Sequence, residues 1–217
     1  MATKILLINP NSNDAVTEGM REAVAPLSIP HGPVMECMTL HTGPFGVETQ
    51  RDVDSVAVPL ADVVHARPDA EVYVIACYSD PGLAVCREAT QKPVLGIREC
   101  SIFSALSVAD RFGLIALSQG SVRRHSRAFR EMGVSTRCAG FAPLGMSVAK
   151  AEEPGAFPHI EAAGQRLLES GADAVVLGCA GMARHRAPLE ERLGVPVVDP
   201  VQAAAAQALG LALLRAA

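Results

Sequence analysis

The sequence predicts an α/β protein of two pseudo-symmetric lobes, each with a parallel sheet flanked by helices, and an active site in the cleft between them. Three observations support this prediction. Short apolar strands alternate with helix-length segments along the chain, a pattern typical of parallel sheets with right-handed crossovers. The second half repeats the first, because a valine-rich run ends in a cysteine in both, at Cys77 and Cys179. A short Pro-Val strand then closes each repeat.

The strands are short apolar runs without alternation, as expected where helices cover both faces of a sheet. They are expected at residues 4–9, 34–40, 72–76, 94–97, 112–117, 134–139, 174–178 and 196–198. Helices are expected near residues 14–25, 52–66, 81–91, 99–110, 120–132, 156–170, 182–193 and 200–215. The last helix is free to pack back on the first lobe. We therefore expect lobe 1 to comprise residues 1–98 completed by residues 200–217, and lobe 2 to comprise residues 99–199.

Composition indicates a compact globular protein, since 49% of the 217 residues are hydrophobic and 19% are charged. A net charge of −4 gives no electrostatic footprint for nucleic acid. The arginines at 123, 124, 127 and 130 are interpreted as the solvated face of one helix. We expect no signal peptide, because the strand pattern begins at Lys4 without the long apolar region of such a peptide, and the sequence contains no run of about 18 apolar residues that could span a membrane. We therefore expect a cytoplasmic protein with reduced cysteines.

Cys77 and Cys179 are predicted to carry the chemistry, because both end strands at the sheet edge where parallel α/β proteins bind ligands. Asp80 is expected to cap a helix that begins at Pro81. The N-terminus of that helix would lower the pKa of Cys77. Each cysteine alone could be a small buried residue at a strand end, but the symmetric pair favours catalysis.

The remaining reactive side chains offer no competing site. Four cysteines are interpreted as packing residues, namely Cys37, Cys86, Cys100 and Cys138. His185 could approach Cys179 but is interpreted as a surface residue, and no two histidines share a helical face as metal ligands would. The three lysines lie outside any recognisable pyridoxal phosphate setting, and the Gly-x-Gly-x-x-Gly spacing of dinucleotide sites is missing. We therefore expect acid–base chemistry with no cofactor and no metal.

The loops that follow equivalent strands are expected to bind the substrate. Helix capping explains the serine and asparagine residues there equally well. In the loop 41–48, Phe45 is a candidate apolar contact. The expected substrate-binding residues are Pro10, Asn11, Phe45, Tyr78, Ser79, Ser118, Gln119, Gly178, Ala180 and Gly181.

Four motifs together resemble the aspartate/glutamate racemase superfamily, specifically its hydantoin racemase branch. They are Asn9-Pro10-Asn11-Ser12, Gly43-Pro44 with Glu48, Cys77-Tyr78-Ser79-Asp80-Pro81-Gly82-Leu83, and Gly178-Cys179-Ala180-Gly181-Met182. The resemblance covers nearly the whole chain, and the order and spacing of the motifs are more specific than any one of them. It implies cofactor-independent racemisation by two cysteines on opposite faces of the substrate carbon.

The same resemblance indicates the substrate class. Amino-acid racemases of the superfamily commonly carry Cys-Asn-Thr and Cys-Thr-His motifs, from which this chain departs at both cysteines. We therefore expect inversion at C5 of a hydantoin-type cyclic ureide, either a 5-substituted hydantoin or allantoin. Racemisation of aspartate or glutamate and a maleate-type isomerisation by Cys77 remain alternatives. A decarboxylase of this fold keeps only the second cysteine, so Cys77 argues against that activity.

A different class of function is a two-lobed ligand sensor that uses the same cleft without catalysis. Such a sensor would have no need of a thiol on each face. The expected partners are a small-molecule substrate and further copies of the chain in a homo-oligomer, with no nucleic acid and no membrane. The roles of Glu48 and His185, the ring substituent, and the cysteine that deprotonates each enantiomer stay open.

Overall fold

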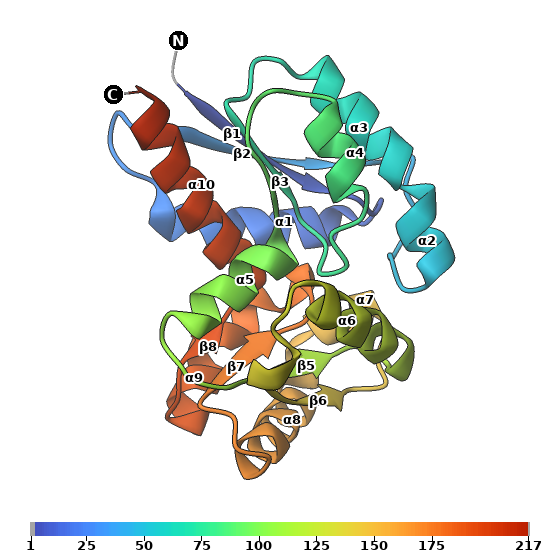
Figure 1. Ribbon diagram of the computed structural model, residues 1–217, viewed down its shortest axis with the longest axis vertical. Helices are drawn as coiled ribbons and strands as arrows, with labels where there is room; N and C mark the ends of the chain where they lie inside the picture. The colour runs from blue at the N-terminus through green and yellow to red at the C-terminus, as the bar shows by residue number, and fades with distance from the viewer. Residues whose placement is uncertain (1–2, 217) are drawn as a thin grey trace.

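Two four-stranded parallel sheets form the frame of the computed structural model, which describes residues 3–216 (Figure 1). The first sheet has the order β2-β1-β3-β4 and the second the order β6-β5-β7-β8, so the two halves share one topology. The strands are β1 (Lys4–Asn9), β2 (Val34–Thr39), β3 (Val72–Ile75), β4 (Val94–Gly96), β5 (Phe112–Ala116), β6 (Cys138–Pro143), β7 (Ala174–Leu177) and β8 (Val197–Val198). The predicted fold class and the duplication are confirmed.

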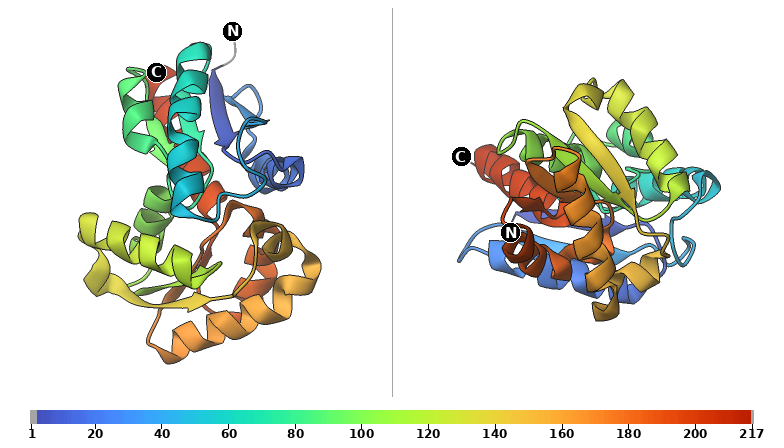
Figure 2. Two further views of the ribbon diagram at one scale, coloured as in Figure 1. Left: turned by 90° about the vertical axis from the view of Figure 1, so that its right-hand side faces the viewer. Right: turned by 90° about the horizontal axis from the view of Figure 1, so that it is seen from below.

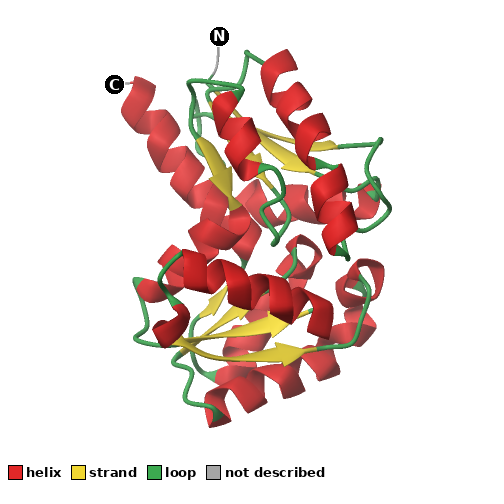
Figure 3. Cartoon of the chain, turned by 45° about the vertical axis from the view of Figure 1, so that its right-hand side comes forward, coloured by secondary structure: helices red, strands yellow, loops and turns green. Residues whose placement is uncertain are grey.

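Helices connect the strands and cover both faces of each sheet (Figure 3). The α-helices are α1 (Asp14–Val24), α2 (Gln50–Ser55), α3 (Ala57–Ala66), α4 (Leu83–Glu88), α5 (Ile97–Leu106), α6 (Gln119–Glu131), α7 (Val148–Glu152), α8 (Phe157–Glu169), α9 (Arg186–Leu193) and α10 (Pro200–Ala216). Short 3₁₀ helices lie at Ala25–Leu27 (η1), Ser135–Arg137 (η2), Pro154–Ala156 (η3) and Ala180–His185 (η4). No helix within residues 3–216 is long and apolar enough to cross a membrane.

Successive residues of a strand point to opposite faces, which explains the unbroken apolar runs in the sequence. In β1, Ile5 and Leu7 pack in one cluster with residues of α1 and α10, whereas Leu6 and Ile8 pack in another with residues of α3 and α4. The second sheet repeats this arrangement, with α8 and α9 on one face and α5 and α6 on the other (Figure 2).

The C-terminal helix α10 returns to the first sheet, where it contacts β1, β3 and β4. Fully buried alanines, among them Ala204, Ala205 and Ala208, allow a close approach to the strands. Gln202 fastens the start of the helix, because its Nε2 donates a 3.0 Å hydrogen bond to the carbonyl of Ala23 in α1. The lobe boundary between residues 98 and 99 stays a prediction, since the largest apolar cluster includes residues from both sheets.

Several expected element bounds are wrong. The sixth strand covers Cys138–Pro143 and not 134–139, because residues 135–137 form the 3₁₀ helix η2. The helix expected at 52–66 is two helices that meet at Val56. Helix α7, which the sequence analysis did not predict, lies between β6 and α8.

Candidate active site

Cys77 and Cys179 line the same cavity, which encloses about 420 Å³ including its open mouth. Both are free thiols, as are the other four cysteines. The cavity lining is largely apolar, with polar groups at a few points. Its lining residues are Asn11, Val16, Val47, Ala76, Cys77, Tyr78, Ser79, Leu117, Ser121, Arg124, His125, Val148, Gly178, Cys179 and Ala180.

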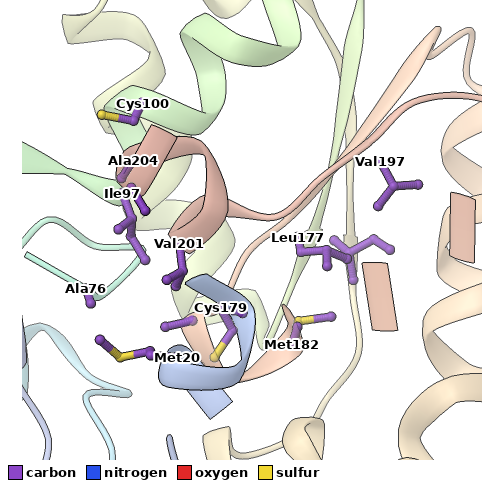
Figure 4. Close-up of a cluster of buried hydrophobic side chains, with 14 of the residues drawn as sticks. Met20, Ala76, Ile97, Cys100, Leu177, Cys179, Met182, Val197, Val201 and Ala204 are labelled. Atoms are coloured by element: carbon purple, nitrogen blue, oxygen red, sulfur yellow. The ribbon is translucent and has the colours of Figure 1, made fainter. Parts of the chain in front are cut away.

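Each cysteine lies two residues beyond the end of an inner strand of its sheet. Cys77 follows β3, and Cys179 follows β7. In the second half this position depends on Gly178, whose backbone N–H donates to the carbonyl of Ile115 at 2.8 Å. A Cβ on Gly178 would lie 2.3 Å from that oxygen, so only glycine allows this close approach. Cys179 is buried near Met20, Met182 and Val201 (Figure 4).

The turn after Cys77 differs from the predicted helix start. Helix α4 begins at Leu83, with Gly82 before it in the left-handed region at φ 64°. Asp80 does not cap this helix; its buried carboxylate accepts hydrogen bonds from the backbone N–H groups of Arg98 (3.0 Å) and Glu99 (3.1 Å). It therefore caps α5, which follows β4, and fastens the Cys77 turn to a helix distant in sequence. The backbone of Asp80 has a φ of 46°, which residues other than glycine seldom adopt.

The pKa expectation for Cys77 is also wrong in direction. Burial raises the pKa of the Cys77 thiol to about 11 and that of Cys179 to about 12, because desolvation disfavours the thiolate. Backbone N–H groups oppose this effect at both thiols, from Ser79 at Cys77 and from Gly181 at Cys179. The turns after the cysteines therefore direct N–H donors at the sulfurs.

Asn11 enters the cavity from the loop after β1, within a network of buried amides. Its Oδ1 accepts from the Nδ2 of Asn9 (3.1 Å) and from the backbone N–H of Asn13 (3.0 Å). Asn13, in turn, caps α1 by accepting from the N–H of Ala15. The Asn11 Nδ2 donates no hydrogen bond within the described chain, so it is available to a carbonyl oxygen of a ligand.

Helix α6 brings side chains to the cavity that the sequence analysis did not select: Ser121, Arg124 and His125. Their i, i+3, i+4 spacing places them on one face of the helix. This spacing, directly after a strand end, is the feature of the sequence from which they could have been selected. Arg124 is half-buried and does not belong to a solvated face, which corrects the interpretation of the arginine group. His125 packs edge-on against Tyr78 with ring centroids 4.9 Å apart. Burial lowers the pKa of His125 to about 3, so this imidazole is neutral.

Five of the ten expected substrate-binding residues line the cavity: Asn11, Tyr78, Ser79, Gly178 and Ala180. The other five, Pro10, Phe45, Ser118, Gln119 and Gly181, do not. Phe45 is 65% exposed, and Val47 is the cavity contact from its loop. The Ser118 hydroxyl accepts from the N–H of Ser121 as the cap of α6.

Two residues whose roles were open connect parts of the site. His185 is buried, which corrects its interpretation as a surface residue, and its Nε2 lies 3.1 Å from the carbonyl oxygen of Ala151. This contact joins η4, the turn after Cys179, to α7. Glu48 accepts through Oε1 from the N–H of Val148 (2.9 Å), at the start of α7. Within residues 3–216, no three His, Cys, Asp or Glu side chains gather as a metal site would require.

Comparison with known proteins agrees with this geometry. A family model described as Asp/Glu/Hydantoin racemase matches residues 5–208. The chain is 35% identical to a hydantoin racemase of Paenarthrobacter aurescens, over 97% of this chain and 92% of the relative.

Two solved structures are similar over nearly their whole length. Allantoin racemase from Klebsiella pneumoniae superposes with a TM-score of 0.93 at 29% identity, over 99% of this chain and 89% of that one. Allantoin racemase from Pseudomonas fluorescens gives a TM-score of 0.91 at 28% identity, over 98% and 92% of the two chains. The chain therefore belongs to the Asp/Glu/hydantoin racemase family and is an isomerase that acts on a small molecule.

Proposed function

We propose that this enzyme inverts the C5 stereocentre of a hydantoin-type cyclic ureide, a 5-substituted hydantoin or allantoin, with Cys77 and Cys179 as its acid–base pair. The observation that carries the proposal is that two thiols, from equivalent strand ends of the duplicated halves, line one cavity. The names of the similar proteins, hydantoin racemase and allantoin racemase, support the same substrate class.

The proposed reaction uses one thiol as base and the other as acid. A thiolate takes the proton from C5, and the electron pair moves into the adjacent carbonyl to form an enolate. The neutral thiol on the opposite face then gives its proton to C5, which restores the carbonyl with inverted configuration. The roles exchange for the other enantiomer. No redox step occurs, so the proposed chemistry needs no nicotinamide. The ring carbonyl accepts the electron pair and the two thiols move the protons, so the proposed reaction also proceeds without pyridoxal phosphate or a metal.

The cavity lining suits a neutral ring. Polar groups there include the Asn11 amide and the Ser79 hydroxyl, which can bond to ring carbonyl and N–H groups. No aspartate or glutamate is among the described lining residues, so an α-ammonium group would find no carboxylate partner in the cavity. This favours a cyclic ureide over free aspartate or glutamate.

The decisive test measures proton exchange and inversion separately. Cys77→Ser and Cys179→Ser should each abolish net racemisation, because serine is a far weaker base than a thiolate. Each variant keeps one thiol, so in D₂O the two variants should label opposite enantiomers at C5. Incubation with EDTA serves as a control and should leave wild-type activity unchanged.

Other outcomes identify the alternatives. If both variants label the same enantiomer, the two-faced mechanism is wrong. Full turnover by Cys77→Ser would favour a decarboxylase-like use of Cys179 alone, and faster racemisation of aspartate or glutamate than of any hydantoin would refute the substrate class. Binding without exchange in the wild type would favour the sensor. Assembly into a homo-oligomer stays a prediction that sedimentation velocity can test.

A further inference from the structure

The cavity lined by the two cysteines contains one arginine and no lysine among its described residues. This residue, Arg124, belongs to α6 in the second half of the chain, whereas Cys77 follows β3 in the first. The Arg124 Nη2 donates a 2.8 Å hydrogen bond to the carbonyl oxygen of Glu48, which also belongs to the first half. The guanidinium is therefore held across the cleft between the halves.

The Arg124 Nε is buried and has no hydrogen-bond partner within the described chain. A buried donor without a partner destabilises the folded protein. Burial lowers the pKa of Arg124, but a guanidinium stays charged in proteins. A fixed positive charge with an unused donor at a cavity wall suits an anion that forms during the reaction, and the nearby Cys77 becomes one when it ionises.

The charges around the two thiols are unequal. At Cys77 the carboxylate of Asp80 raises the pKa, and two guanidinium groups, those of Arg124 and Arg98, lower it. Apart from Cys77 itself, the charged groups that influence Cys179 are the carboxylates of Glu152 and Asp199, and both raise its pKa. His125, the other titratable side chain of α6 at the cavity, is neutral. Positive neighbours favour a thiolate and negative neighbours disfavour it, so ionisation of one thiol favours Cys77.

Building on the proposed two-cysteine reaction, we propose that Arg124 is a positioning residue that holds the negative charge on Cys77, so that Cys77 is the base and Cys179 the neutral acid of the free enzyme. A turnover that begins in this state moves the C5 proton to Cys77 and the Cys179 proton to C5. The enzyme then carries a Cys77 thiol and a Cys179 thiolate. Loss of a proton from Cys77 to solvent and uptake of one by Cys179 restore the starting state.

The test measures the ionisation of each thiol without substrate. Alkylation by the neutral reagent iodoacetamide is followed at pH 8, and peptide mass spectrometry gives separate rates for Cys77 and Cys179. Because the thiolate is the reactive form, Arg124→Gln should slow alkylation of Cys77 about tenfold, the effect of one pKa unit. Alkylation of Cys179 should stay within about twofold of its wild-type rate.

Two further variants separate charge from shape. Arg124→Lys keeps a positive charge and should restore most of the Cys77 rate. Arg123→Gln removes an exposed guanidinium from the same helix, outside the cavity lining, and should leave both rates unchanged. In parallel, Arg124→Gln should lower kcat/KM for racemisation about tenfold at pH 7 and at pH 8 alike.

The proposal is overturned if Cys77 of Arg124→Gln is alkylated at the wild-type rate or faster. It is overturned as well if the substitution slows the alkylation of both cysteines equally. It is also overturned if Arg123→Gln slows Cys77 as much as Arg124→Gln does. Alkylation needs no substrate, so its outcome is independent of the reaction proposed above. A wild type that fails to racemise any hydantoin but shows the Arg124 effect would refute only the proposed function.

Discussion

The raised pKa values of the two thiols predict a steep dependence of racemisation on pH. With a Cys77 pKa of about 11, only about one enzyme in a thousand carries the thiolate at pH 8. As long as the pH stays below the pKa, the thiolate fraction rises tenfold with each unit by which the pH increases. Since kcat/KM reports the ionisation of the free enzyme, it should rise about 100-fold between pH 6.5 and pH 8.5. Loss of one proton from either thiol gives this slope.

The assay is the initial rate of racemisation of a single enantiomer of a 5-substituted hydantoin, followed by chiral chromatography at substrate concentrations well below KM. Uncatalysed racemisation is measured at each pH and subtracted, and the ionisation of the substrate is titrated separately. A rate that levels off below pH 8, at a pH where the substrate is still neutral, would refute the reasoning. It would mean that the essential thiol ionises far more readily than its burial allows.

Two further predictions concern stability. Asp199 is buried, and burial raises its pKa to about 7, so the folded protein keeps this proton where the unfolded chain has lost it. The contribution of Asp199 to stability should therefore fall as pH rises from about 4 to about 7. Asp199→Asn keeps the Oδ1 acceptor for the N–H of Gln202 and should be more stable at pH 8, by on the order of 4 kcal/mol in urea unfolding. If the stability difference between Asp199→Asn and the wild type does not grow with pH, the raised pKa of Asp199 is contradicted. Gly178→Ala should lower the free energy of unfolding by about 1–3 kcal/mol and remove most of the activity, because the added Cβ would clash with the Ile115 carbonyl oxygen. Gly210→Ala, at an exposed helical site with open space, should instead stabilise by about 0.5–1 kcal/mol, and equal effects of the two would refute the steric argument.

The sequence by itself determined the fold class and the catalytic candidates. Strands such as Lys4–Asn9 and Ala174–Leu177 are continuous apolar runs because helices cover both faces of each sheet. Such a run is a local property that the sequence alone reveals. The duplication placed Cys77 and Cys179 at equivalent strand ends, which fixes their position at the same edge of each sheet. Helices without a strong local signal, such as Val148–Glu152, were missed because five residues carry little periodicity.

Only the tertiary structure decided the environment of the thiols. Asp80 was expected to cap the next helix, but it caps α5, because the packing of β3 beside β4 brings the start of α5 to the Cys77 turn. Arg124 was expected in solvent, but the approach of the two halves places it in the cavity. The pKa of Cys77 rises because the surrounding chain desolvates the thiol. Desolvation and charge depend on what packs around a residue, and neighbours distant in sequence supply that environment.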